Sequence, residues 1–294
     1  MKPIFTLAIL FACLAQVQAQ EKSMLDDIKD SSPQSQKISG AFKSIRVINA
    51  HSTEMLGKGN LDIRILHRFG LINQGAKELF GLDHASMRLG AAYGISNHLM
   101  AGIGRSTFRK ELDAFVKIRW LQQSKGYKAM PVSLLTAIGT TVWTEKSFDS
   151  IKPGYKERSS YYLQLIIGKK ITPAFSLQLS PILLYSSNAV NVGSHNTIVA
   201  LGGGGRLKFS KRMAITWDYH HYLGPKVAGY RSSLSIGVDI ETGGHVFQLH
   251  FSNAVGMNER AYLAQTTDEF FKADIRFGFN LSRIFLLAKS KPKH

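Results

Sequence analysis

Asp218 and His220 lie two positions apart in the segment WDYHHY, which alternates apolar and polar side chains. On a β-strand these two side chains share a face, because successive residues point to opposite sides. A carboxylate and an imidazole in this arrangement could bind an ion or relay a proton. A hydrogen bond inside the protein is the simpler use of the same pair. His221 points to the other face, so His220 and His221 cannot bind one ion together.

Two further sequence motifs bear on possible chemistry. The stretch LGGGGRLKFSK at 201–211 is rich in glycine, but it lacks the Gly-Lys-Ser/Thr ending of a phosphate-binding loop and no helical pattern follows it. Its glycines suit a strand that bends or that another segment approaches closely. The sequence has no Gly-x-Ser-x-Gly pattern of a nucleophile elbow. We therefore expect no enzyme, no metal site and no cofactor.

Hydrophobicity alternates with a period of two along the chain from residue 61 onward. In HVFQLHFSNAV, for example, Phe247, Leu249 and Phe251 alternate with Gln248 and His250. Such alternation is typical of strands whose two faces meet different surroundings. It predicts about twelve strands, at 61–69, 85–95, 99–107, 111–121, 131–142, 160–170, 175–185, 196–209, 213–222, 232–241, 245–253 and 268–282.

The links between these segments are sorted by length. Tight links at 96–98, 172–174, 210–212 and 242–244 alternate with long links at 70–84, 143–159, 186–195, 223–231 and 254–267. Outer-membrane barrels have short periplasmic turns, longer outer loops and usually an even number of strands. We therefore expect an all-β, antiparallel transmembrane β-barrel of about twelve strands with both termini periplasmic, or of fourteen strands if 41–50 joins the wall. A soluble β-sandwich is the alternative, and it gives no reason for sorted links.

A membrane barrel turns one face of each strand to lipid and the other to the lumen. Phe247, Leu249 and Phe251 are then expected to contact lipid. A charged side chain facing the bilayer midplane costs roughly 2–4 kcal/mol, so the charged faces should point inward. The polar residues predicted to line the lumen are Arg64, Arg68, Arg88, Lys117, Arg119, Arg206, Lys208, Asp218, His220, Gln248, His250, Lys272, Asp274 and Arg276.

Basic residues outnumber acidic ones in this lumen-lining set. An electropositive lumen attracts anions, which predicts a pore for small anionic solutes. The same charges can instead pair with one another and fill a narrow barrel. The alternative is therefore a closed, non-conducting barrel that acts as a scaffold or interaction protein at the outer membrane. Outer-membrane lipid is an expected partner in both cases, and nucleic acid is not, because the chain is expected to be exported.

Residues 1–19 have the form of a secretory signal peptide, with Lys2, an apolar run and a small residue before Gln20. The only cysteine, Cys13, lies within it, so the expected mature chain contains none. Loss of Lys2 lowers the net charge from +17 to +16. Residues 20–59 are expected to form a polar N-terminal segment with a periplasmic or lumenal hairpin, 60–285 the barrel, and 286–294 a basic tail.

Four stretches, LDIRILHRFG (61–70), LFGLD (79–83), RLGAAYGIS (88–96) and GIGRS (102–106), resemble a family of uncharacterised β-barrel proteins of Gram-negative bacteria. The resemblance extends from about residue 40 to the C-terminus and is most specific at 67–70 and 81–83. It implies an outer-membrane barrel with a domain of unknown function, and it implies no activity, substrate or cofactor. Because opposite charges stand at a strand end and in the returning loop, we expect Arg68 to pair with Asp83.

Overall fold

The computed structural model describes residues 35–145, 154–187, 196–224, 229–242 and 244–287. The signal peptide, residues 20–34 and most of the basic tail lie outside these ranges and stay predictions. Among the described residues, no helix has the length and apolar character needed to cross a bilayer.

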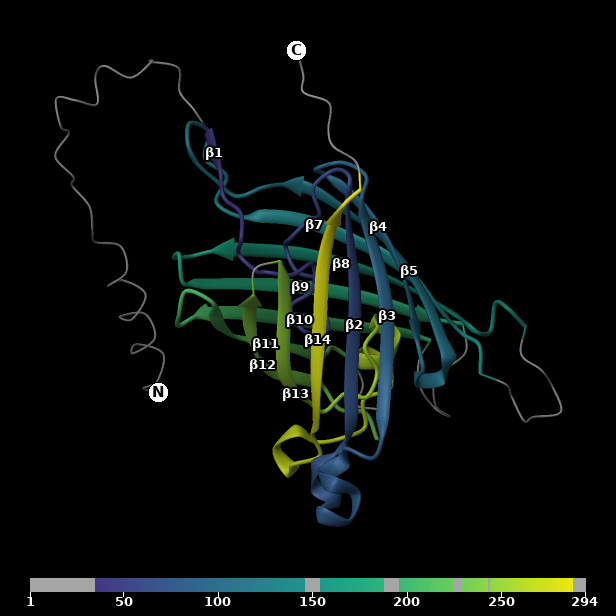
Figure 1. Cartoon of the computed structure of the whole chain (residues 1–294). Coiled ribbons are helices and arrows are strands. Elements are labelled where there is room, and N and C mark those ends of the chain that lie inside the picture. Colours follow the sequence, from purple (N-terminus) through teal and green to yellow (C-terminus); the bar gives the residue numbers. More distant parts are fainter. Residues whose placement is uncertain (1–34, 146–153, 188–195, 225–228, 243, 288–294) are drawn as a thin grey trace, which may run out of the picture. The chain divides into compact units, whose positions relative to one another are not determined.

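Twelve antiparallel strands form a closed barrel. They are β2 (Asn60–Leu71), β3 (Ala85–Gly94), β4 (Leu99–Ser106), β5 (Glu111–Leu121), β7 (Ser133–Trp143), β8 (Ser159–Lys170), β9 (Phe175–Ser186), β10 (Thr197–Lys208), β11 (Met213–Tyr222), β12 (Ser233–Thr242), β13 (His245–Ser252) and β14 (Arg276–Leu286). Pairing of β14 with β2 closes the ring (Figure 1). Closure gives every strand two partners, which a sheet in lipid requires. The predicted twelve-stranded fold is confirmed.

Side chains alternate between the two faces of this wall. On β13, Gln248 and His250 are buried inside the barrel, whereas Phe251 is 43% exposed on the outside. Leu249 and Phe247 share the outer face, and Phe247 packs against Phe279 of β14 with ring centroids 6.0 Å apart. The apolar face therefore points outward, as a membrane barrel requires.

The inner face has two different halves. Strands β11 to β14 and β2 to β5 bury charged and polar side chains, among them Arg68, Arg88, Lys117 and Asp218. Strands β7 to β10 bury a group of apolar side chains beside polar ones such as Gln164, Gln178 and Arg206; the apolar ones are Leu135, Ala137, Ile166, Ile182, Leu184, Ile198 and Ala200. This apolar half is not expected of a water-filled lumen, because apolar surface is stable only when something covers it.

The barrel has two unlike ends. The four tight links, the start of β2 and the end of β14 lie at one end, the short-turn end. The other end, the long-loop end, carries the long links, with the short helices η2 (Ile72–Gln74), η3 (Ala76–Gly81) and η4 (Phe108–Lys110). Outside the wall, β1 (Ser35–Lys37) pairs with β6 (Ser124–Gly126) in a separate two-stranded sheet. Residues 41–50 do not enter the wall, so the fourteen-stranded alternative is wrong.

The last strand begins later than predicted. β14 starts at Arg276, and residues 268–275 instead include the short helix η5 (Phe270–Lys272) and Ala273 in the left-handed conformation, with φ 63°. Lys272 and Asp274 therefore lie in the loop before β14, and their predicted place in the lumen is wrong. The side chain of Lys272 is 71% exposed and pairs with Glu269 at 2.9 Å.

Candidate functional site

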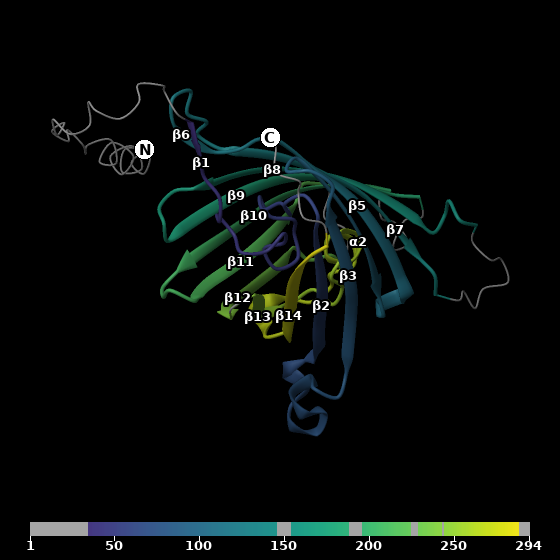
Figure 2. The same cartoon turned by 45° about the horizontal axis from the view of Figure 1, so that its top comes forward.

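The lumen contains the chain's own N-terminal region. Residues 38–57, here called the plug segment, run between β1 and the start of β2, and their purple trace lies inside the ring of strands (Figure 2). Residues 45–53 are buried throughout. Ile45 and Leu56 join a hydrophobic cluster with Phe115 of the inner wall. This part of the N-terminal segment, expected to form a periplasmic or lumenal hairpin, thus lies in the lumen, where a solute path was expected.

The tip of the plug segment is a tight turn at 47–50, closed by the amide of Val47, which donates to the carbonyl of Ala50 at 2.9 Å. The amides of residues 48, 49 and 50 all donate to Oδ2 of Asp218, at 3.2, 2.7 and 3.2 Å. Successive amides that converge in this way form an anion site. Here the anion is a carboxylate of the barrel wall, so Asp218 anchors the tip of the plug.

Several predicted lumen residues bind backbone carbonyls of the plug segment. Lys117 donates to the carbonyl of Glu54 at 2.7 Å, and Arg119 donates to that of Thr53 at 3.1 Å. Gln248 donates to another plug carbonyl at 2.7 Å. These donors were expected to meet solutes. Instead, each satisfies a polar group that would otherwise be buried without a partner.

The link at 253–275, here called the inserted loop, also folds into the barrel. It carries α2 (Glu259–Ala264), all six residues of which are buried. Asn258 caps the helix by accepting a hydrogen bond from the amide of Ala261 at 2.9 Å, and it donates to Glu111 of β5 at 2.6 Å. The helix packs on β8, β9 and β10. It therefore covers the apolar half of the inner wall.

The plug segment and the inserted loop meet inside the barrel. Nη1 of Arg46 lies 2.7 Å from Oε1 of Glu259, and both side chains are almost fully buried. Arg68 of β2 binds both parts, donating to Oδ1 of Asn49 at 2.5 Å and to a carbonyl of the inserted loop at 2.6 Å. Asp83 is exposed on its loop, so the predicted pair of Arg68 with Asp83 is wrong.

Burial sets the charge states at this junction. Burial is the largest influence on the pKa of Arg46 and lowers it, but the charge and hydrogen bond of Glu259 together with the nearby Tyr162 and Tyr262 outweigh burial, so the pKa is raised overall and Arg46 stays charged. Burial and the nearby Arg46 hold the pKa of His51 well below its usual 6.5. His51 is therefore neutral, and its contact with Glu259 at 3.4 Å is not an ion pair. Burial also raises the pKa of Tyr262 well above 10.

The remaining predicted lumen residues contact the wall, the plug segment or the inserted loop. Four arginines form ion pairs: Arg88 with Asp113, Arg64 with Asp62 at 2.8 Å, Arg206 with Glu241 at 2.8 Å, and Arg276 with Asp268. The two histidines are hydrogen-bonded, since His220 contacts Ser233 at 3.1 Å and His250 accepts a hydrogen bond from Arg68 at 3.3 Å. Lys208, near the end of β10, is partly buried.

Little empty space remains beside the plug segment. A cavity between it and β2, β13 and β14 has a volume of about 10 Å³, room for about one water molecule. Asp218 binds the plug amides and His220 contacts Ser233, and the described residues contain no group of three or more His, Cys, Asp or Glu side chains that could hold a metal ion.

The sequence also matches a known protein family. The family described as a membrane bound beta barrel domain (DUF5777) matches residues 42–285. The chain belongs to this family. The match includes the plug segment from residue 42 and the whole inserted loop, so both are part of the DUF5777 domain rather than additions to it. No curated protein matches the sequence.

Solved structures with some likeness to this DUF5777 barrel are porins and other membrane barrels. The NanC porin has 10% identity and a TM-score of 0.47, with 77% of this chain and 98% of that chain covered. The KdgM porin has 10% identity and a TM-score of 0.45, with coverage of 76% and 98%. Omp33, an outer membrane protein of Acinetobacter baumannii, has 9% identity and a TM-score of 0.40, with coverage of 78% and 99%.

Sequence reasoning left the N-terminal segment as a periplasmic or lumenal hairpin and identified no residue of the DUF5777 lumen in it. Arg46 and Asn49 lie in 41–50, which was expected either in that segment or in the wall, and Glu259 lies in a predicted link. One signal was present. The strands that became β7 to β9 are apolar on both faces, as in SPILLYS at 180–186, and such strands need apolar cover on both sides.

Proposed function

We propose that this barrel lies in the outer membrane with both termini in the periplasm, and that the plug segment and the inserted loop keep it closed in its resting state. In that state it acts as a scaffold or interaction protein rather than as a standing pore. The predicted signal peptide and the short turns at the end where the wall begins and ends support this location and orientation.

The observation that carries the closed state is the triple hydrogen bond to Asp218. Three plug amides surround one buried wall carboxylate, and hydrogen bonds to charged groups are among the stronger ones in proteins. The basic side chains that would attract anions already have hydrogen-bond partners. Lys117 donates to two plug carbonyls, and Arg68 donates to both the plug segment and the inserted loop.

A second candidate function is an anion path that opens when the plug leaves. It is favoured by the composition of the polar half of the wall, where Arg64, Arg68, Lys117 and Arg119 all contact the plug segment. Without the plug these side chains would face water, and an electropositive lumen selects anions. Small anionic solutes are then the expected cargo. We propose no catalytic role.

Planar-bilayer conductance of the purified barrel tests both candidates. Three proteins are compared: the mature chain, a variant with residues 40–53 replaced by a Gly-Ser linker of equal length, and a control with the exposed residues 35–37 of β1 replaced in the same way. We expect no steady current from the mature chain or the control. We expect the plug-replaced variant to conduct and to prefer chloride over potassium in a KCl gradient.

Each result has a definite meaning. A steady anion current from the mature chain would overturn the closed resting state. A folded but silent plug-replaced variant would overturn the gated path and leave the permanent scaffold. Folding of each variant is checked by its resistance to unfolding in cold detergent.

A further inference from the structure

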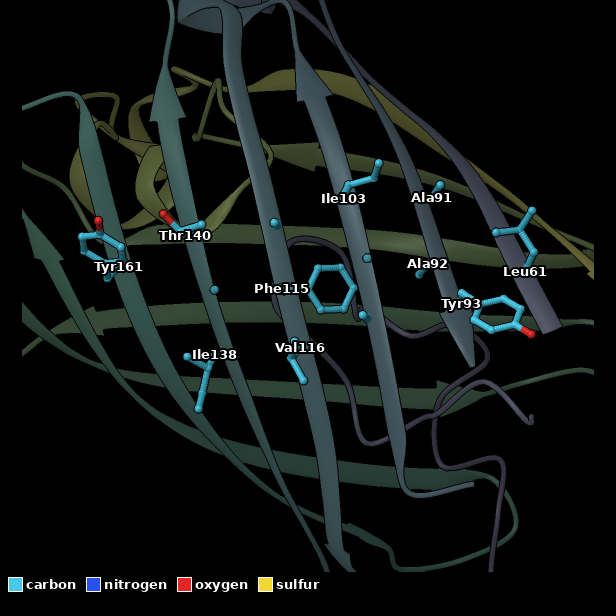
Figure 3. Close-up of a pocket in the computed structure, with 14 residues that line it drawn as sticks. Leu61, Ala91, Ala92, Tyr93, Ile103, Phe115, Val116, Ile138, Thr140 and Tyr161 are labelled. Carbon is cyan, nitrogen blue, oxygen red and sulfur yellow. The ribbon is translucent and has the colours of Figure 1, made fainter. Parts of the chain in front are cut away.

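The outer wall of the barrel is apolar between its two ends. An open hollow of about 680 Å³ on this wall is lined by side chains such as Ile103, Val116 and Ile138 (Figure 3). Strands β8, β9 and β10 have twelve residues each, slightly more than the roughly 9–11 residues with which a tilted strand crosses a bilayer. The ends of these strands, and the tight links that follow β8 and β10, therefore lie at the depth of the lipid headgroups.

The short-turn end carries one continuous basic stretch. Strands β5, β7, β8, β9, β10 and β11 follow one another around the ring. Their three links at this end, 122–132, 171–174 and 209–212, contain no aspartate or glutamate. The next tight links on either side, 95–98 and 242–244, contain no lysine or arginine, so basic charge is not a general property of the strand ends. The exposed cations of this stretch, here called the basic sector, are Lys125, Lys128, Lys169, Lys211 and Arg212.

The protein does not neutralise the basic sector. Within the ranges that the structure describes, no acid forms an ion pair with any of its five cations. Glu241, near the end of the adjacent strand β12, is already paired with Lys43 and with Arg206, each at 2.8 Å. The long-loop end differs, because its loops carry acids beside the bases, as in the pair of Lys272 with Glu269 at 2.9 Å. The uncompensated charge at the short-turn end therefore fits an anionic partner.

Each link of the basic sector also exposes a large apolar or aromatic side chain. Tyr127, Ile171 and Phe209 are 52%, 49% and 55% exposed. The ammonium group of Lys128 lies 5.4 Å from the ring of Tyr127. Aromatic rings and the stems of basic side chains favour the boundary between lipid and water, where the apolar part meets acyl chains and the charge meets headgroups. A bilayer surface therefore fits both features of the sector, whereas a soluble anion would meet only the charges.

We propose that the basic sector binds the headgroups of anionic phospholipids in the membrane leaflet at the short-turn end. Lysine ammonium groups act as point charges toward phosphate, and arginine adds paired hydrogen bonds. The proposal rests on the membrane placement proposed above, and in that orientation the leaflet is the periplasmic one. A zwitterionic lipid offers the same phosphate without a net negative charge, so the sector selects anionic lipid over it.

Trp217 is a built-in reporter beside the sector. It lies on the outer face of β11, four residues after Met213 at the start of that strand, and it lines one hollow together with Lys169. The experiment uses the full mature barrel with Trp120→Phe and Trp143→Phe, which leaves Trp217 as the only tryptophan. This parent is reconstituted in vesicles of phosphatidylcholine and phosphatidylglycerol with identical acyl chains, and one of the two lipids carries bromine on its chains. Bromine quenches an adjacent indole, so quenching at several lipid ratios gives the relative binding constant of the two lipids beside Trp217.

Two variants of this parent lose the same amount of positive charge in different places. The sector variant combines Lys169→Gln, Lys211→Gln and Arg212→Gln. The control makes the same substitution at three exposed lysines of the long-loop end, which are Lys77, Lys110 and Lys156. A general effect of net charge would appear in both variants, and an effect of the basic sector only in the first.

We expect phosphatidylglycerol to bind beside Trp217 about fivefold more strongly than phosphatidylcholine in the parent and the control, the factor that one cation near an anionic surface supplies. The sector variant should bind the two lipids equally. Equal binding by the parent, or the same loss of preference in the control, would overturn the proposal. So would loss of the preference in millimolar inorganic phosphate at constant ionic strength, because the cations would then bind a free anion. Quenching by neither lipid would refute the placement of this wall in a bilayer, and the proposal with it, whereas the closed lumen is tested by conductance alone.

Discussion

Asp218 offers the sharpest test of how the lumen is closed. The substitution Asp218→Asn keeps the shape of the side chain but removes its charge. In the native protein, the carboxylate of Asp218 is fully buried and accepts hydrogen bonds from three plug amides, at 3.2, 2.7 and 3.2 Å. The asparagine oxygen can still accept hydrogen bonds, so the change isolates the contribution of the charge at the plug tip.

The magnitude follows from the difference between charged and neutral acceptors. A hydrogen bond to a charged group contributes about 1.5–3 kcal/mol and a neutral one about 0.5–1.5 kcal/mol, so each bond loses about 1 kcal/mol. Three bonds give a loss of about 3 kcal/mol in plug docking, which shifts the equilibrium between docked and released plug roughly 150-fold.

Cysteine labelling measures this equilibrium directly. The only cysteine, Cys13, lies in the predicted signal peptide, so Ala50→Cys places a single thiol at the plug tip. Ala50 is 2% exposed, so a maleimide reaches this position only when the plug is released. When release and docking are fast compared with labelling, the rate is proportional to the released population. We expect labelling to be about 100-fold faster in the Asp218→Asn background.

The control is Asp113→Asn, a buried wall acid whose ion-pair partner is Arg88 in the same wall. It changes the charge of the lumen without touching the plug segment, so labelling at position 50 should stay within a few-fold of the parent rate. Equal labelling rates in the Asp218→Asn and Asp113→Asn backgrounds would refute the anchoring role of the three amides.

Three further predictions concern the plug segment. Glu259→Gln leaves Arg46 buried without its counter-charge, and should weaken docking by about 3 kcal/mol, measured as faster labelling of the plug tip. The low pKa of His51 means that only the released plug takes up a proton near pH 6.5. Docking strength is therefore constant above that pH and is lost below it. The labelling rate, divided at each pH by the rate of a free cysteine because only the thiolate reacts, should rise about tenfold per pH unit below 6.5, and His51→Gln should flatten this rise. A Cβ at Gly94 would overlap the carbonyl oxygen of Gly57, so Gly94→Val should displace the end of the plug and lower the melting temperature, whereas an unchanged melting temperature would argue against that close approach.

The wall could be predicted from the sequence because lipid imposes a strict alternation. Each barrel strand turns an apolar face outward, and all twelve predicted segments overlap a strand of the structure. The error at 268–275 has a local cause. Phe271, Ala273 and Ile275 continue the period of two, but Ala273 adopts a left-handed conformation, and a period in hydrophobicity carries no information about such a turn.

The contents of the lumen could not be predicted in the same way. An inward arginine has the same sequence signature whether it faces water, an acid of the wall or a backbone carbonyl. Arg46 and Glu259 are 213 positions apart, and neither lies in one of the twelve predicted strands. Their pairing depends on how a loop folds inside a closed barrel, and a single sequence carries no signal of that contact.

The plug segment and the inserted loop are held in the lumen by different interactions, and this difference decides which of the two can act as a gate. The inserted loop covers the apolar half of the wall, where Tyr262 and Leu263 join the cluster of Ile166 and Ile182. Its removal would expose apolar surface to water, which is unfavourable. The plug segment also buries apolar side chains such as Ile45 and Leu56, but its tip and its backbone carbonyls are held by hydrogen bonds to the wall, and water can replace these partners when the plug leaves. Release of the plug alone therefore costs less free energy than release of the loop, so we expect any opening of this barrel to begin at the turn that binds Asp218.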